Sequence, residues 1–252
     1  MIPKKFYQTW KTKNLHGEVR EIIDKMLDQN PSYGYELYDD SDMFYFIKEN
    51  YGKDVLKAYE ELQIGAAKAD LWRYLVLYKN GGVYLDIDSE IYANLDNLLK
   101  EDDQAVLSRE TNIGLFVQWC LMFDKNHPIL EKTIVDCILN IRKKDTDDIL
   151  RITGPHVFSK AVKSLNEKYL TNIQPSYIKD VHRTKDRLVN PAIQLKFPEK
   201  LKYKLFFFDY AGYANFKHSK GDFLYTNDII PWREENKFKS VFKDKSEDLS
   251  FI

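Results

Sequence analysis

Apolar and polar positions recur along the first part of the chain in a way that predicts strands and helices in turn. A first strand is predicted over Phe6–Trp10, and a helix follows that Asn30-Pro31 ends. The next predicted strand is Tyr35–Tyr38, and a second helix is predicted to begin at a cap formed by Asp40 or Ser41. This order of elements is typical of an α/β protein.

The most regular helical pattern covers Ala66–Asn80, where apolar residues line one face. Gly81-Gly82 supplies the left-handed backbone that ends such a helix, and an apolar strand, Val83–Asp88, follows at once. A helix is therefore predicted to lead through a tight turn directly into a buried strand.

The rest of the chain continues the alternation without a repeat, a low-complexity tract or a linker. We predict strands over Ala105–Ser108, Leu115–Phe123 and Leu205–Asp209, and helices over about Pro128–Lys143 and Pro155–Tyr169. The charged tail after Lys237 is expected to fray or to form a short surface helix. The 252 residues are expected to form one α/β domain.

Composition narrows the function classes. With 38 Lys and Arg against 39 Asp and Glu, the chain is close to neutral, which argues against a protein that coats nucleic acid or an anionic membrane. The two cysteines, Cys120 and Cys137, belong to no disulfide or zinc motif and favour a reducing compartment. Without an apolar leader or a long apolar run, we expect a cytoplasmic protein with no transmembrane segment, although it can visit a membrane surface.

An acidic pair, Asp86 and Asp88, ends the predicted strand after the two glycines. Alternate residues of a strand point to one side, and their Cα atoms lie roughly 6.6 Å apart, so both carboxylates can reach one cation directly or through its water. Carboxylate oxygens suit hard divalent cations such as Mg²⁺ and Mn²⁺. The strand therefore predicts a metal site.

The D-x-D pattern by itself is weak, because it occurs three times in this chain. Asp40 and Asp42 are expected at the start of a helix, and Asp145 and Asp147 in a solvated turn. Only the pair at 86 and 88 ends an apolar strand, where ligands bind in α/β proteins.

Asp70 and Arg73 lie three residues apart on the predicted helix before this strand. Such residues share a helix face, so one interpretation is a simple ion pair. The other is that the polar face of the helix borders the acidic strand, where an Arg neutralises phosphate and a carboxylate holds sugar hydroxyls.

Three segments together resemble the DXD sugar-binding glycosyltransferases of family 32, a group that includes yeast initiating α-1,6-mannosyltransferases, bacterial capsule enzymes and, more distantly, clostridial glucosylating toxins. The segments are Ile2-Pro3-Lys4-Lys5-Phe6-Tyr7-Gln8-Thr9-Trp10, Ala69-Asp70-x-x-Arg73-Tyr74 and Gly81-Gly82-x-Tyr84-Leu85-Asp86-x-Asp88. They cover about the first 90 residues, with fainter echoes at Asn126-His127-Pro128 and Thr153-Gly154-Pro155.

The resemblance implies a GT-A fold, with a Rossmann-like mixed sheet flanked by helices, and a nucleotide-sugar donor such as a UDP-sugar or GDP-mannose. It implies Mn²⁺ or Mg²⁺ held by Asp88 and Asp86, and catalytic roles for Asp86, Asp88 and Arg73. The implied substrate-binding residues are Tyr7, Gln8, Trp10, Asp70, Arg73, Tyr84 and Asp86. Residues 1–90 would form the donor half, and 91–252 the acceptor half with a closing segment.

Two positions depart from the family pattern. Tyr7 stands where the first motif usually has His, and the C-terminal His of the family is matched by His218, without the Ser-Trp pair that often follows. His218 is the candidate to complete the metal or phosphate site. His127 and His156 flank prolines at predicted helix starts, where capping or packing is the expected role.

The expected reaction is metal-dependent transfer of a hexose or N-acetylhexosamine to a hydroxyl of a saccharide, glycolipid or protein, with retention, in polysaccharide or glycoconjugate biosynthesis. No nucleic-acid partner is expected. A two-carboxylate glycoside hydrolase and an inactive sugar- or nucleotide-binding module are the alternatives.

Overall fold

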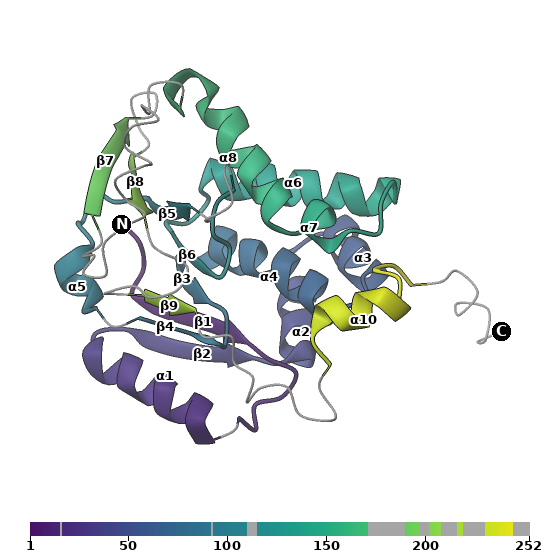
Figure 1. Cartoon of the computed structure of the whole chain (residues 1–252), viewed down its shortest axis with the longest axis horizontal. Coiled ribbons are helices and arrows are strands. Elements are labelled where there is room, and N and C mark those ends of the chain that lie inside the picture. Colours follow the sequence, from purple (N-terminus) through teal and green to yellow (C-terminus); the bar gives the residue numbers. More distant parts are fainter. Residues whose placement is uncertain are drawn as a thin grey trace.

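The structure is a computed structural model that describes residues 1–15, 17–91, 93–109, 115–170, 190–196, 202–207, 216–218 and 230–243. Within these residues, seven strands form one mixed sheet and two more form a small second sheet, with helices on both sides of the large sheet (Figure 1). The predicted α/β architecture with a mixed central sheet is confirmed. None of the described helices is long and apolar enough to span a bilayer.

The large sheet has the strand order β2-β1-β3-β6-β5-β8-β7. β1 pairs in parallel with β2 and β3, whereas β6 runs antiparallel between β3 and β5. Its strands are β1 Lys5–Thr9, β2 Gly34–Tyr38, β3 Gly82–Leu85, β5 Ala105–Arg109, β6 Cys120–Phe123, β7 Asn190–Lys196 and β8 Lys202–Phe207. In the second sheet, β4 Ser89–Ile91 pairs antiparallel with β9 Phe216–His218.

Helices cover the two faces of the large sheet unequally. Side chains alternate along β3, so Tyr84 joins the main core with α4 while Val83 and Leu85 join a smaller core with α1 and α5. The helices are α1 Gly17–Gln29, α2 Asp40–Asn50, α3 Lys53–Glu61, α4 Gly65–Asn80, α5 Leu95–Leu98, α6 Pro128–Lys143, α7 Ile149–Ile152, α8 Pro155–Leu170 and α10 Trp232–Phe238. The thicker helical layer therefore lies on the α4 side.

The predicted glycine turn joins α4 to β3. Gly81 has φ 65° and Gly82 has φ 110°, backbone conformations that residues with a Cβ rarely adopt. A Cβ at Gly82 would also lie 2.7 Å from the carbonyl oxygen of Lys5 on the neighbouring strand. The two glycines let β3 enter the sheet immediately after the helix.

Several predicted boundaries differ from the structure. Asp39, not Asp40 or Ser41, caps α2, because its carboxylate accepts the backbone N–H groups of Ser41 and Asp42. The strand predicted from residue 115 is formed only at 120–123, and the one predicted at 205–209 lies at 202–207. Helices α3, α5 and α7 were not predicted.

The C-terminal segment, residues 230–243, packs more firmly than its charge indicates. Helix α10 lies before the predicted tail, and Val241 and Phe242 are buried. Gln63 donates to the carbonyls of Ser240 and Phe242, and Asp147 accepts from the backbone N–H of Val241 at 2.7 Å. Asp147 is thus a binding point for this segment rather than a solvated turn residue.

Candidate functional site

Asp86 and Asp88 lie in a tight turn between β3 and β4, not on a strand. The strand predicted to end at Asp88 stops at Leu85, and the carbonyl of Asp86 accepts the N–H of Ser89 at 3.0 Å. The backbone N–H of Asp86 donates to the carbonyl of Trp119 at 2.8 Å. The acidic pair is therefore presented by a closed turn at the C-terminal end of β3, an interior strand of the sheet, as a binding loop of an α/β protein is.

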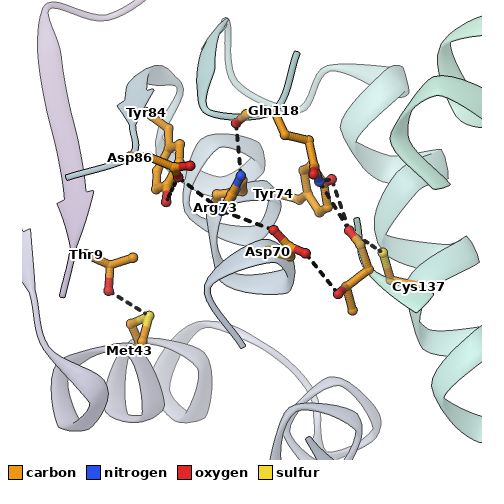
Figure 2. A network of polar contacts seen from close by, with 10 residues as sticks. Thr9, Met43, Asp70, Arg73, Tyr74, Tyr84, Asp86, Gln118 and Cys137 are labelled. Atoms are coloured by element: carbon orange, nitrogen blue, oxygen red, sulfur yellow. Dashed lines mark hydrogen bonds and ion pairs between the residues drawn. The ribbon is translucent and has the colours of Figure 1, made fainter. Parts of the chain in front are cut away.

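Arg73 of α4 lies between two carboxylates. Its Nη2 is 3.0 Å from Asp70 and 3.1 Å from Asp86, so the predicted ion pair with Asp70 forms and the polar face of the helix borders the acidic turn (Figure 2). The guanidinium also lies over the ring of Tyr84, 4.7 Å from its centroid, and the Tyr84 hydroxyl donates to Oδ1 of Asp86 at 2.8 Å. Helix α4 and the turn after β3 thus meet in one charged cluster.

The side chains of this cluster differ in how far they are exposed to solvent. The side chains of Arg73 and Asp70 are only 7% and 11% exposed, whereas that of Asp86 is 28% exposed. A ligand would meet Asp86 first, and Arg73 would act on it through its charge from behind.

Two residues that were not predicted as site residues, Gln118 and Thr153, hold this cluster from the other side. The backbone carbonyl of Gln118 accepts a hydrogen bond from Nη1 of Arg73 at 3.1 Å, and the hydroxyl of Thr153 donates to Oδ2 of Asp70 at 3.1 Å. The amide of Gln118 in turn contacts the hydroxyl of Tyr74 (Figure 2). It also donates to the carbonyl of Thr153. Of these two residues, only Thr153 was indicated by the sequence, through the weak resemblance to the family at Thr153-Gly154-Pro155.

Burial raises the pKa of Asp70 and of Asp88 despite the neighbouring Arg. The pKa of Asp70 is raised to about 6, mainly because the carboxyl is removed from water. Burial, and then the charge of Asp86, raise the pKa of Asp88 well above its usual range. Ionised carboxylates are costly in such a place unless a cation meets them.

This donor set fits a hard divalent cation. Two carboxylates, Asp70 and Asp86, pair with one guanidinium, and Asp88 follows in the same turn, so acidic groups outnumber the single cation and offer oxygen ligands. Where the structure gives side chains, no group of three or more His, Cys, Asp and Glu residues is arranged as a complete metal site. The remaining ligands would come from elsewhere, for instance from a bound diphosphate and water.

The three residues predicted from the first motif lie in different surroundings. Gln8 is fully buried, and its Nε2 donates to the carbonyl of Asp86 at 3.1 Å. Trp10 packs against the small apolar cluster that contains Ile87, between the two aspartates. Tyr7 points to the other face of β1, into the main core. The structure thus brings Gln8 and Trp10 to the acidic turn and Tyr7 away from it.

The three histidines named in the sequence analysis lie in different parts of the structure. Residue His218 pairs with Ser89 across the small sheet, so its backbone lies beside the residue after Asp88; its side chain falls outside the described part. His127 caps α6, because its Nδ1 accepts the N–H of Ile129 at 3.3 Å, as expected. His156 is exposed at the start of α8.

The region that holds α4 and the acidic turn matches a known family. Residues 17–105 match the family described as glycosyltransferase sugar-binding region containing DXD motif. This span includes Asp70, Arg73, Tyr84, Asp86 and Asp88.

Curated relatives are similar over longer stretches. An initiation-specific alpha-1,6-mannosyltransferase of Candida albicans is 27% identical over 69% of this chain, and the alignment covers 55% of that protein. Inositol phosphoceramide mannosyltransferase 3 of Schizosaccharomyces pombe is 33% identical over 53% of this chain and 36% of its own length. The chain spans only about half the length of the Candida relative.

A solved structure supports the fold. The PaToxG glycosyltransferase superposes with a TM-score of 0.57 at 20% identity, over 71% of this chain and 75% of its own. The predicted GT-A fold is therefore confirmed, and the charged cluster lies within the matched family region. Residues 17–105 of the chain thus match the DXD sugar-binding region of these glycosyltransferases, within a fold like that of a solved glycosyltransferase.

Proposed function

We propose that this protein transfers a hexose from a nucleoside-diphosphate sugar to a hydroxyl acceptor, with a divalent cation, and that the sugar is mannose. The observation that carries the proposal is the position of Arg73 between Asp70 and Asp86, at the turn that presents Asp88. The match of residues 17–105 to the DXD glycosyltransferase family supports the reaction class, and the names of the relatives support mannose as the sugar.

The difficult step is the departure of the nucleoside diphosphate, because negative charge develops on its oxygens as the glycosidic bond breaks. Arg73 is a fixed positive charge for this step, since three acceptors hold its guanidinium in place before a substrate arrives. Its charge stabilises the leaving group without reorganisation of the side chain.

Asp86 and Asp88 are the residues that would hold Mn²⁺ or Mg²⁺, which when bound supplies Lewis-acid stabilisation of the diphosphate. Tyr84 and Arg73 both bind Oδ1 of Asp86 and so orient its carboxylate. We further propose that Asp70, held by Thr153, orients the donor sugar, and that the anomeric configuration is retained, as the family resemblance implies.

The acceptor is proposed to be a hydroxyl of a saccharide or a glycolipid. The relatives named for inositol phosphoceramide mannosylation favour a lipid-linked acceptor, which a protein of cytoplasmic location can meet at a membrane surface. A hydrolase with two carboxylates would need neither a nucleotide nor a metal, and this distinguishes it experimentally.

Thermal unfolding with nucleotides tests the proposal. GDP, UDP, GDP-mannose and UDP-glucose are each added with Mn²⁺ and with EDTA, because a ligand of the folded state raises Tm. We expect a shift with the guanosine series that requires Mn²⁺, and slow release of mannose from GDP-mannose. A shift with UDP compounds alone would reject mannose. No shift with any nucleotide would reject the transferase, and binding without any release of sugar would indicate a binding module.

A further inference from the structure

A hydrogen-bonded pair of side chains, the buried Gln8 of β1 and the partly buried Tyr35 of β2, lies beneath the acidic turn. The Tyr35 hydroxyl donates to Oε1 of Gln8 at 3.0 Å, and Nε2 of Gln8 donates to the carbonyl of Asp86 at 3.1 Å. Gln8 has no exposed surface, so a substrate could reach its amide only by displacing the residues above it. The amide therefore faces the protein, not the ligand.

The carbonyl that Gln8 binds is also the one that closes the turn. It accepts the N–H of Ser89 at 3.0 Å, so residues 86–89 form a β-turn with Asp88 at its third position. The direction of the Asp88 side chain relative to Asp86 depends on this carbonyl. A side chain that fixes the carbonyl thus fixes both carboxylates.

Tyr35 is well placed to hold the Gln8 amide in one orientation. Its ring packs against the cluster that contains Ile87, the residue between the two aspartates. Burial raises the pKa of the Tyr35 hydroxyl, which therefore stays protonated and donates to Oε1 of Gln8. The carbonyl of Asp86 can only accept, so Nε2 of Gln8 faces it, and the hydrogen bond from Tyr35 to Oε1 holds the amide in this orientation.

We propose that Tyr35 and Gln8 are positioning residues that fix the Asp86–Asp88 turn for cation binding. The part of this inference that concerns the cation rests on the proposed function. The part that concerns the turn rests on the two hydrogen bonds alone. Gln8 then acts through the backbone of Asp86 instead of touching the donor.

Tyr35→Phe is the central variant, because it removes a single oxygen atom. Tyr38→Phe is the matched control: Tyr38 lies on the same strand, and its hydroxyl donates to Glu36 at 2.8 Å, away from Gln8. Gln8→Leu removes the second hydrogen bond. All three are first checked by thermal unfolding.

The first measurement is hydrogen exchange of the Ser89 amide by NMR, with the Tyr84 amide of β3 as internal reference. We expect exchange at Ser89 to become about 5-fold faster in Tyr35→Phe, the size of one neutral hydrogen bond, and to stay unchanged in Tyr38→Phe. Unchanged exchange in both Tyr35→Phe and Gln8→Leu would overturn the inference. This result does not depend on any ligand.

The second measurement is Mn²⁺ binding by calorimetry in the presence of GDP. We expect the dissociation constant to rise by about 5-fold in Tyr35→Phe and to match wild type in Tyr38→Phe. Faster exchange with unchanged Mn²⁺ affinity would also overturn the inference. If the wild-type protein binds no Mn²⁺, the proposed function fails, while the exchange result still decides whether Gln8 fixes the turn.

Discussion

The hydroxyl of Thr153 donates a 3.1 Å hydrogen bond to the carboxylate of Asp70, a residue 83 positions earlier in the chain. The carbonyl of Thr153 also accepts from the hydroxyl of Tyr74, one turn further along α4. The loop between α7 and α8 is therefore joined to the polar face of the helix that carries Arg73. The second half of the chain thus supports the site that the first half forms.

Thr153→Val should lower sugar transfer more than it lowers nucleotide binding. The variant keeps the shape of the side chain but removes the donor to a buried carboxylate, a loss of roughly 1.5–3 kcal/mol. Because Asp70 is proposed to orient the sugar, we expect about a tenfold or greater loss of kcat/KM with unchanged affinity for GDP. Thr153→Ser should restore activity. Equal activity of Thr153→Val and wild type would remove Thr153 from the site.

Asp88→Asn should abolish turnover and leave the fold intact. Burial and the charge of Asp86 disfavour the ionised form of Asp88, so a neutral amide of the same size does not destabilise the ligand-free protein. We expect an unchanged or raised Tm without ligand, and loss of the Mn²⁺-dependent Tm shift with nucleotide. Full activity of this variant would contradict the metal assignment.

Arg73→Met should be strongly destabilising, because it leaves Asp70 and Asp86 without their buried partner. Removing one member of a buried pair costs about 3–5 kcal/mol, which urea unfolding will measure. The double variant with Asp70→Asn should regain part of this loss, since one uncompensated charge is removed as well. If the two changes are simply additive, the charges of Asp70 and Arg73 are not coupled.

Protonation of His127 should lower the free energy of unfolding in mild acid. Burial lowers its pKa to about 4 from an ordinary value of 6.5, so the unfolded chain binds more protons between these values. The contribution of neutral His127 to the free energy of unfolding is fully present above pH 6.5. It is lost progressively as the pH falls from 6.5 through about 4. The maximal loss is roughly 3 kcal/mol. The free energy of unfolding is measured with urea at pH 7 and at pH 4.5. It should fall less between these two pH values in His127→Asn, which can still cap α6, than in the wild type.

The fold could be predicted well where its signals are local. The helix over α4 and its glycine end depend on apolar spacing and on the positive φ of Gly81 and Gly82, both of which short sequence patterns reveal. The end of β3 could not be predicted in this way. Its alternation continues to Asp88, and it stops at Leu85 because Ser89–Ile91 pairs with Phe216–His218, more than 120 residues later.

The acidic turn and Arg73 were predicted as site residues, but their surroundings were not. Gln118 contributes a backbone carbonyl, and any residue type has one. Tyr35 lies in an ordinary strand pattern, and only the parallel pairing of β1 and β2 brings it beside Gln8. Contacts of this kind depend on tertiary packing, which one-dimensional spacing does not contain.

The hydrogen bonds from Gln63 to the carbonyls of Ser240 and Phe242 limit how early the protein can finish folding during its synthesis. The two partners are 177 and 179 residues apart, so this joint, immediately before α4, stays open until the ribosome has delivered residue 242. Contacts so distant in sequence close late, since the loop between them has to be ordered first. The helix that carries Arg73 is thus made long before the contacts of Gln63, just ahead of it, can form.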